Sequence, residues 1–534
     1  MRTKRILVVG GGSSGWMAAA YLNAALNRGG QQVADIALVE SPDVPRVGVG
    51  EATIPNINRL LAIIGIDERE FMIAVDGTFK QSIRYVNWLN NNDHYHHPFS
   101  RFDIRPIDHS ASEWLQSDRS IPFMETVSAQ PLICEMGLSP KRLDGQPFGT
   151  TLTYAFHMNA LKFADFLTQH SIARGVTHYR EHVVDVEMQE NGYIAAVKTK
   201  IGQRLEADLF IDCTGFRARL IEKELGVGFV DCSQWLLCDR AVTLHVDYDH
   251  HYPGYVKPYT TATALSSGWV WEIPLQNTRS LGYVHSSHHI SEENAERELR
   301  AFEGPHANAL SSRVVNFKVG RREKVWVGNC IAIGLAGGFI EPLESTGLYL
   351  SDLACVLLAE HFPFTGDFEP MAFRVNRILA NRFYEILDFI NMHYCLTQRT
   401  DTQFWRDVRQ PERTNDRLRA KLDYWKLKPP SPSDFQDQFF PGQPAGPMAT
   451  GNWPGDQRAP IDTAGLWGHT SYEAILYGMD FLRNECDQRY GRDRPRTRLL
   501  QQILNTVEFA REQLPAHDRW LAHNLGMPSY RKTQ

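Results

Sequence analysis

The sequence predicts an α/β protein in which a doubly wound nucleotide-binding module is followed by a mainly helical region. Three observations predict this fold class. Residues 6–9 form a short apolar strand that runs into a glycine-rich loop, and residues 36–40 form a second apolar strand ending in an acid. From residue 348 onward, apolar residues recur at helical spacing. Strands that alternate with helices build a parallel sheet, whereas a later run of helices alone marks another region.

The totals limit the possible classes of protein. A chain of 534 residues is too long for one simple core, so we expect two parts, at 1–355 and 356–534, with substrate-facing segments inserted at about 90–150. The net charge of -6, without a basic stripe, excludes nucleic acid as a partner. No apolar run is long enough to cross a membrane, and the apolar stretch near the start is too short for a signal peptide. We therefore expect a cytoplasmic protein.

Cysteine and histidine spacing gives no metal site. The eight cysteines include no C-x-x-C pair, so we expect reduced cysteines that serve mostly in packing. His94, His96 and His97 form a cluster, but no cysteine or glutamate at metal-type spacing completes a ligand set.

The first strand leads into a dinucleotide fingerprint in its proper context. The loop at residues 10–15 reads Gly-Gly-Gly-Ser-Ser-Gly and is followed by a helix rich in small residues. Its glycines allow a tight turn and a close approach of the backbone to a pyrophosphate, while Glu40 can hold ribose hydroxyls. The predicted cofactor contacts here are Gly10, Gly12, Ser13, Ser14, Gly15 and Glu40.

Later strand ends indicate which dinucleotide binds. Residues 207–215 and 325–334 each read as a strand followed by a turn of small residues. Strand ends spread over so much of the chain suit an extended FAD better than a compact nicotinamide unit. Since no second G-x-G-x-x-G motif occurs, the reducing power must come from outside.

Three further segments each allow a structural and a functional reading. Residues 47–55 are either a plain connection or a glycine-rich loop that touches the nucleotide. Lys80, ahead of an alternating strand, is either a surface lysine or a functional one. Residues 268–274 place Trp269 and Trp271 on one face of a strand, and such pairs are most often core.

The loop at residues 337–347 precedes a helix that starts near Leu348. Ser345 or Thr346 can cap this helix, and its remaining free amides suit an anion or the polar edge of a cofactor. The alternative is an ordinary capped helix whose acids, Glu341 and Glu344, favour its positive end. Beyond it we expect a helix around residues 373–390, a long loop at 428–465 and an amphipathic helix at 496–514.

Taken together, these motifs resemble the flavin-dependent tryptophan halogenase family. The resemblance rests on the fingerprint at residues 10–16, Gly-x-Gly-Glu-Ala-Thr at 48–53, the Phe79-Lys80 pair, Gly-Trp-x-Trp-x-Ile-Pro at 268–274 and Glu-Pro-Leu-Glu-Ser-Thr-Gly at 341–347. It implies an FAD-binding Rossmann-like module of the flavin monooxygenase type. It also implies an enzyme that uses reduced FAD from a separate flavin reductase, O₂ and chloride or bromide to make hypohalous acid, which halogenates tryptophan, indole or a related arene.

The same resemblance implies roles for individual residues. Thr346 and Gly347 would hold the halide, Lys80 would receive the oxidant, and Glu344 would polarise it or act as a base. Lys80 would work either as an N-halo amine or as a hydrogen-bond donor to hypohalous acid. Trp269 and Trp271 would separate flavin from substrate. The implied FAD contacts outside the fingerprint are Gly48, Gly50, Ala52, Val183, Leu335 and Leu348.

The substrate end departs from the family pattern. His97 and Phe99 match the pair that sandwiches the indole, and Trp467 matches a second aromatic residue. Leu466 stands where the family has phenylalanine, and Asp462 where it has the glutamate that grips the substrate ammonium. These changes make an arene other than free tryptophan a serious alternative. A flavin-dependent aromatic hydroxylase and an inactive flavin-binding protein are alternative functions, and a homodimer is one open oligomeric state.

Overall fold

The computed structural model describes residues 3–46, 48–102, 110–149, 151–248, 256–435, 466–482 and 497–527. The chain forms two compact units. The first comprises residues 1–77, 158–232 and 317–383, and the second comprises 78–157, 233–316 and 384–534. The division at residue 355 expected from the sequence differs from this grouping, because strands from the middle of the chain pair with one another and belong with the C-terminal helices.

The first unit is built on a six-stranded sheet in the order β20-β21-β12-β1-β2-β8. All neighbours run parallel except β20 and β21. Its strands are β1 (Lys4–Val9), β2 (Ala34–Glu40), β8 (Thr177–Arg180), β12 (Leu209–Asp212), β20 (Trp326–Val327) and β21 (Cys330–Ala332). Since β1 lies inside the sheet with later strands on both sides, the predicted doubly wound order is confirmed.

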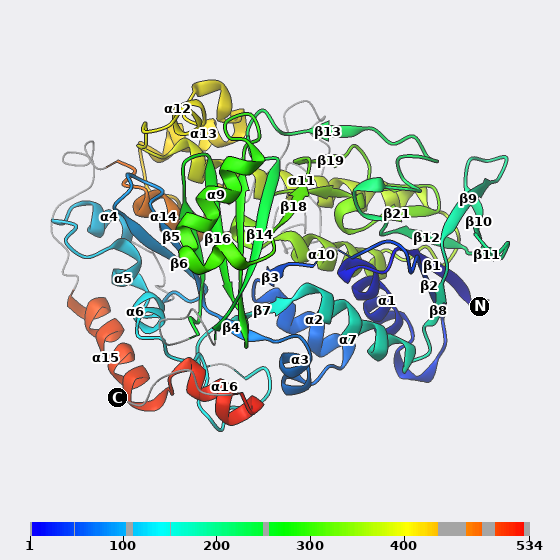
Figure 1. Cartoon of the computed structure of the whole chain (residues 1–534), viewed down its shortest axis with the longest axis horizontal. Helices are drawn as coiled ribbons and strands as arrows, with labels where there is room; N and C mark the ends of the chain where they lie inside the picture. The colour runs from blue at the N-terminus through cyan, green and yellow to red at the C-terminus, as the bar shows by residue number, and fades with distance from the viewer. Residues whose placement is uncertain are drawn as a thin grey trace. The chain divides into compact units, whose positions relative to one another are not determined.

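Two layers cover this sheet. Leu7 and Val9 alternate along β1 and pack in one apolar cluster with Val186 and Val197 of a small antiparallel sheet. Helix α1 contacts β1, β2, α2, α7 and α10, and these helices lie side by side in Figure 1. The remaining elements of this unit are β3 (Gly50–Ala52), β9 (Val183–Met188), β10 (Ile194–Thr199), β11 (Arg204–Glu206), β13 (Phe229–Asp231), β19 (Gly320–Arg322), β22 (Gly338–Phe339), α1 (Ser13–Leu26), α2 (Asn56–Ile64), α3 (Glu68–Ala74), α7 (Ala160–Ile172) and α10 (Gly347–Glu360).

The prediction of a single strand at residues 325–334 is wrong. This segment contains a short hairpin of β20 and β21, because Gly328 adopts φ +52° and turns the chain. The residues after β21 then form two short 3₁₀ turns, Gly334–Ala336 and Pro342–Glu344, before α10 begins.

The second unit is built on a seven-stranded sheet in the order β18-β14-β17-β16-β15-β5-β6. Only β15 and β5 run parallel in it. Its strands are β5 (Ser82–Val86), β6 (His94–Pro98), β14 (Arg240–Asp247), β15 (Thr260–Ala264), β16 (Gly268–Pro274), β17 (Thr278–His285) and β18 (Arg313–Asn316). The strand predicted after Lys80 is therefore confirmed as β5.

Helices complete the second unit, and α9 lies on strands β14 and β17 (Figure 1). Its helices are α4 (Ser110–Leu115), α5 (Phe123–Val127), α6 (Gln130–Glu135), α9 (Glu292–Glu303), α12 (Gln403–Asp407), α13 (Asp416–Trp425), α14 (His469–Gly478), α15 (Thr497–Gln513) and α16 (His517–Leu525). Helix α11 (Glu369–Cys395) runs from the first unit into the second. The predicted helices at 373–390 and 496–514 are confirmed as α11 and α15. Among the helices described, none combines the length and apolar character needed to span a membrane.

Candidate active site

The glycine loop forms a cradle at the carboxyl end of β1. Gly10 adopts φ +113°, and a β-carbon there would lie 2.2 Å from the carbonyl oxygen of Cys213, which follows β12. A β-carbon on Gly15 would lie 2.0 Å from the carbonyl oxygen of Gly10. Gly12 differs, because no described atom lies within 4 Å of the place its β-carbon would take. The loop is thus tight at two glycines and open at the third, as a bound pyrophosphate requires.

The start of α1 also fits an anionic cofactor. Gly12 is the N-cap residue, so no side chain caps the helix from that position, and the first turn carries no acid. The N-terminus of α1 therefore offers amide groups and the positive end of a helix dipole to a phosphate. Ser13 and Ser14 make internal hydrogen bonds, to the Ala160 carbonyl oxygen at 3.1 Å and to the Ser351 hydroxyl at 3.0 Å.

Glu40 ends β2 beside this loop, and its carboxylate is already engaged. The guanidinium of Arg46 donates to both of its oxygens, at 2.8 and 2.9 Å. His178 Nε2 lies 3.0 Å and Trp16 Nε1 3.3 Å from Oε1. A ribose that binds Glu40 must share it with these groups or displace Arg46, which also pairs with Asp165.

The predicted cofactor loop around Gly48 packs closely against helix α7. A β-carbon on Gly48 would lie 2.5 Å from a methyl group of Leu161 in α7, so a larger residue here would make the Leu161 side chain move. Gly50 and Ala52 are buried in β3, whereas Val183 and Leu335 are partly exposed. Leu348, in the first turn of α10, is buried.

The start of α10 is arranged as an anion site would be. Ser345 has the left-handed value φ +59°, and Thr346 follows it as the N-cap residue without a capping hydrogen bond from its side chain. The expectation that one of these hydroxyls caps the helix is therefore wrong for Thr346. Gly347 opens the helix, and no acid lies in its first turn. First-turn amides have no partner within the helix, so they remain suited to an anion.

Two carboxylates of this loop are buried, Glu341 at 0% and Glu344 at 2% exposure. Sequence alone favoured incidental acids at an exposed helix start. Burial of a carboxylate is costly unless it is hydrogen-bonded or protonated. Glu341 and Glu344 are therefore not surface acids that merely favour the positive end of the helix.

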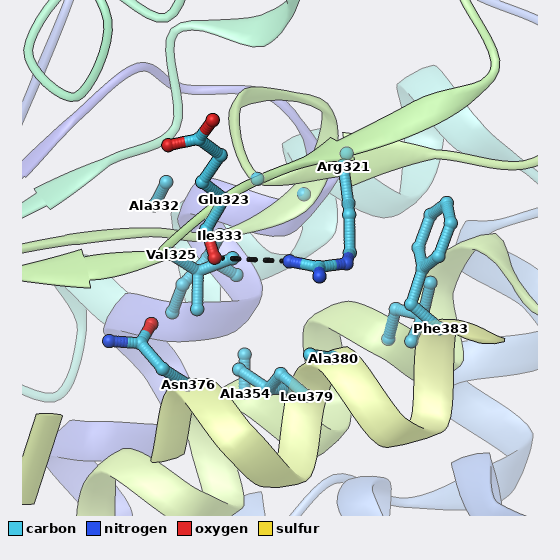
Figure 2. A pocket seen from close by; sticks show the side chains of 14 residues that line it. Arg321, Glu323, Val325, Ala332, Ile333, Ala354, Asn376, Leu379, Ala380 and Phe383 are labelled. Carbon is cyan, nitrogen blue, oxygen red and sulfur yellow. Dashed lines mark hydrogen bonds between the residues drawn. The ribbon is translucent and has the colours of Figure 1, made fainter. Parts of the chain in front are cut away.

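A small cleft, partly open to solvent, lies elsewhere in the first unit. Most of its lining residues are small or apolar, several of them from α10 and α11, and Arg321 reaches along one side (Figure 2). The Arg321 guanidinium donates to the Glu323 carbonyl oxygen at 3.1 Å. None of the predicted FAD or halide residues lines this cleft.

In the second unit, Lys80 is fully buried on β4 (Thr78–Lys80), which pairs with β7 (Ala155–Asn159). Its ammonium nitrogen lies 5.1 Å from the ring centroid of Phe99. The reading of Lys80 as a surface lysine is therefore wrong. A buried lysine is rare, and its ammonium benefits from the face of an aromatic ring.

Two buried histidines fix the strand that carries Lys80. His157 Nδ1 lies 3.0 Å from the Thr78 hydroxyl, and its Nε2 lies 2.9 Å from the Thr260 hydroxyl. The main-chain amide of Phe79 donates to His517 Nε2 at 3.1 Å. Burial and the charge of Lys80 hold the pKa of His157 well below its usual value, and burial lowers that of His517 to about 4. Both imidazoles are therefore neutral at physiological pH.

The tryptophan pair stands on β16, with ring centroids 6.3 Å apart. Both rings are buried, at 1% and 7% exposure. The ring of Trp271 lies directly over Gly282 of β17, where a β-carbon would come within 2.0 Å of it. Since residues two apart in a strand share one face, both rings lie on the same side of the sheet.

Aromatic rings also gather at the predicted substrate residues of the second unit. His97, on β6, lies 5.6 Å from Phe389 of α11. Trp467 stacks on the same Phe389 ring, with centroids 4.1 Å apart and planes at 18°. The amide of Trp467 donates to Glu385 Oε1 at 3.1 Å. Phe389 therefore joins the two aromatic residues that the sequence singled out.

Comparison with known proteins decides the family. The tryptophan halogenase family model matches residues 5–493. Tryptophan 7-halogenase RebH of Lentzea aerocolonigenes is 34% identical over 547 residues, covering 95% of this chain and 98% of that protein.

The chain belongs to the tryptophan halogenase family.

Solved structures of similar proteins agree that the chain belongs to this family. The tryptophan halogenase of Shewanella frigidimarina NCIMB 400 superposes with a TM-score of 0.87 at 31% identity, covering 99% of both chains. Tar14, described as a tryptophan C-6 flavin-dependent halogenase (chlorinase) from taromycin biosynthesis, gives a TM-score of 0.85 at 31% identity, covering 98% of this chain and 100% of that one. The halogenase is thus an FAD-dependent enzyme that halogenates an aromatic substrate with a halide.

The predicted residues of the halogenase fall into two groups, one in each unit. The group in the first unit consists of the glycine loop with Glu40 and of the start of α10 with Thr346 and Gly347. In the second unit they are Lys80 with Phe99, and His97 with Trp467 through Phe389. Leu466 is partly exposed beside Trp467, and Asp462 lies outside the described residues.

Sequence reasoning missed three residues at these places: Glu51, Phe389 and Glu385. Phe389 could have been found, because it lies on the apolar helix pattern of residues 373–390. Glu51 stands within the predicted FAD loop, but nothing in the sequence pairs it with Gly347. Glu385 carries no sequence signal of its contact with Trp467.

Proposed function

We propose that this halogenase transfers chlorine or bromine to an electron-rich arene, either tryptophan, indole or a related compound, through hypohalous acid that reaches Lys80. The observation that carries the proposal is the complete burial of Lys80 beneath the ring of Phe99. A lysine that served solubility would be exposed. A lysine that is buried against an aromatic ring is suited to hold a polar oxidant.

In this proposal the first unit binds FAD and halide. When bound, reduced FAD would supply two of the four electrons that O₂ accepts, and the halide would supply the other two as it becomes hypohalous acid. The glycine loop and the start of α1 hold the phosphates of FAD. The rest of the cofactor is held by Glu40, the loop from Gly48 to Ala52, Val183, Leu335 and Leu348. The amides at Thr346 and Gly347 hold the halide at the positive end of α10.

The second unit supplies the substrate side. Lys80 either forms an N-halo amine, which requires its neutral form, or donates a hydrogen bond from its ammonium to hypohalous acid. His97, Phe99 and Trp467 offer aromatic surfaces to the arene. Trp269 and Trp271 keep it from the flavin. Glu344, of the first unit, polarises the oxidant or accepts the proton that the arene loses.

The test compares two buried lysines of the second unit. Lys141, at 2% exposure, lies 5.5 Å from the ring centroid of Tyr154 and so matches Lys80 in burial and aromatic contact. We expect Lys80→Met to lower halogenated product by about 10²–10⁴-fold. Lys141→Met should lower product much less than Lys80→Met, because it removes a buried lysine that has no predicted role in the chemistry. Product is measured by mass spectrometry with reduced FAD, O₂, bromide and a panel of indoles that includes free tryptophan.

FAD affinity and consumption of reduced FAD are measured in the same samples. The proposal requires both to be unchanged in Lys80→Met. Undiminished halogenation in that variant would remove Lys80 from the mechanism. Hydroxylated product formed without halide would instead support the hydroxylase, and FAD binding without any turnover would support an inactive flavin-binding protein.

We also propose a separate flavin reductase as the source of reduced FAD, a cytoplasmic location and a homodimer. The reductase follows from the family, and the cytoplasm is consistent with free cysteines at the seven described positions. Light scattering of the purified protein tests the homodimer.

A further inference from the structure

The carboxyl group of Glu51 lies beside the first residue of α10. A β-carbon added to Gly347 would lie 3.4 Å from Glu51 Oε1. Glu51 belongs to β3, in the loop predicted to bind FAD, and Gly347 belongs to the predicted halide loop. Both residues are in the first unit. The fold therefore brings a carboxyl group to the place where an anion is expected.

The surroundings of Glu51 favour its neutral form. Burial raises the pKa of its carboxyl group from 4.5 to about 7, and burial is the only cause. No hydrogen bond or ion pair to the Glu51 side chain occurs within the described part of the chain. The charged groups on neighbouring helices, Asp352 of α10 and Arg59 of α2, interact with each other. They do not contribute to the pKa of Glu51.

An anion and an ionised carboxylate cannot share this place without strong repulsion, because little water separates them. A neutral carboxyl group has the opposite effect, since its O–H donates a hydrogen bond and anions are strong acceptors. The amides at the start of α10 add the positive end of the helix dipole. Protonated Glu51 and these amides would then surround one small anion with donors.

We infer that Glu51 is a halide-binding residue whose carboxyl group takes up a proton when chloride or bromide binds at Thr346 and Gly347. The inference rests on the proposed function, because it deepens the halide site assigned there. Below pH 7 the carboxyl group already carries this proton; above pH 7 it comes from solvent, approaching one proton for each halide, and stays on Glu51 while the halide is bound. No covalent bond changes in this step.

The first experiment uses the wild-type protein loaded with oxidised FAD. Sodium bromide is titrated at pH 6, 7, 8 and 9 at constant ionic strength, balanced with sodium gluconate, and binding is followed by flavin fluorescence. Above pH 7 we expect bromide affinity to fall by about tenfold for each pH unit, because only the protonated form of Glu51 binds. Calorimetry at pH 8 in two buffers of different ionisation enthalpy should show nearly one proton taken up per bromide.

Two variants separate Glu51 from other acids. Glu51→Gln keeps the shape and cannot ionise, so its bromide affinity should be nearly constant from pH 6 to 9. Asp352→Asn is the matched control. Burial raises the pKa of Asp352 to about 6, yet it lies further along α10. This control should keep the pH dependence of the wild type.

Bromide binding that does not change with pH in the wild type, or a pH dependence that survives in Glu51→Gln, would overturn the inference. If Glu51→Gln fails to fold, the proton count of the wild type still decides. Turnover of the wild type is measured in parallel. Halogenated product with pH-independent bromide affinity refutes only the role of Glu51, whereas absence of any halogenated product refutes the proposed function and the inference with it.

Discussion

Gly10 and Gly12 belong to the same loop but tolerate an added carbon very differently. Gly10 has φ +113°, and its β-carbon would overlap the Cys213 carbonyl oxygen. Gly12 has φ -75°, and its β-carbon would meet no described atom within 4 Å. We predict that Gly10→Ala destabilises the FAD-free protein by about 1–3 kcal/mol or more, because its backbone is strained and its neighbour is main chain. Thermal or urea unfolding of the FAD-free protein measures this loss.

Gly12→Ala is the matched control for this prediction. Its unfolding should stay close to that of the wild type, while its FAD affinity falls because the methyl group occupies the space meant for the pyrophosphate. Fluorescence titration with FAD measures the affinity. Equal destabilisation of the two variants would contradict the distinction between a structural and a cofactor-facing glycine.

The residues that bear the chemistry were only partly predictable. The glycine loop and Thr346-Gly347 follow from local motifs, since turn and helix-start geometry depends on neighbouring residues. The burial of Lys80 could not be read from its segment, because it depends on Phe99 and on a distant strand partner, β7. The contact of Glu51 with Gly347 likewise joins segments that are distant in the sequence.

At the scale of elements, α11 carries an aromatic residue on its buried face and another on its exposed face. Phe389 is fully buried between His97 and Trp467, whereas Phe373 is 71% exposed. We predict that Phe389→Ala costs about 3–5 kcal/mol of stability. It should also raise the KM for the arene severalfold, because Trp467 loses the ring that orients it. Urea unfolding and steady-state kinetics with a fixed indole measure the two effects.

Phe373→Ala provides the comparison within the same helix. Its change in unfolding free energy should stay within about 0.5 kcal/mol, and its KM should not move. Phe389→Leu keeps most of the buried volume, so it should recover much of the stability and little of the KM. If KM is unchanged in Phe389→Ala, Trp467 does not depend on this contact to bind substrate.

Helices and strands were predicted well where their own residues carry the apolar pattern. The pairing of strands that are distant in the sequence was predicted poorly. Strand β1, helix α11 and helix α15 follow from their own residues. The seven-stranded sheet does not, because its parallel contact joins β5 to β15, which are separated by many other elements. The turn at Gly328 was missed although the sequence signals it, because Gly328-Asn329 between two short apolar runs is typical of a two-residue hairpin turn.

At the scale of the whole molecule, Glu51 makes stability depend on pH. Its pKa in the folded protein, about 7, lies above its usual 4.5, so the folded state holds this proton more tightly than the unfolded state. The stability that Glu51 contributes is complete below pH 4.5 and is lost as pH rises to about 7. Without halide at pH 8, we predict that Glu51→Gln is more stable than the wild type by up to about 3 kcal/mol.

Unfolding by urea at pH 5 and pH 8 measures this difference in both proteins. At pH 5 the difference should be small, since Glu51 is then mostly protonated in the folded state. Comparing wild type with Glu51→Gln at each pH cancels other groups, including Asp352, whose pKa burial also raises. A difference that is equal at both pH values would show that the Glu51 carboxyl group is neutral or fully hydrated throughout.

The threading of the chain through its two units has a consequence for biosynthesis. The six-stranded sheet needs β1 and β2 from the start of the chain and β21 from beyond residue 317, so its edge next to β12 stays open until that segment leaves the ribosome. The second unit likewise waits for residues after 384. Nascent chains shorter than this carry unpaired strands, which are sites for aggregation and for chaperone capture. Expression yield of this halogenase should therefore respond more to chaperone supply and translation speed than that of an enzyme with consecutive domains.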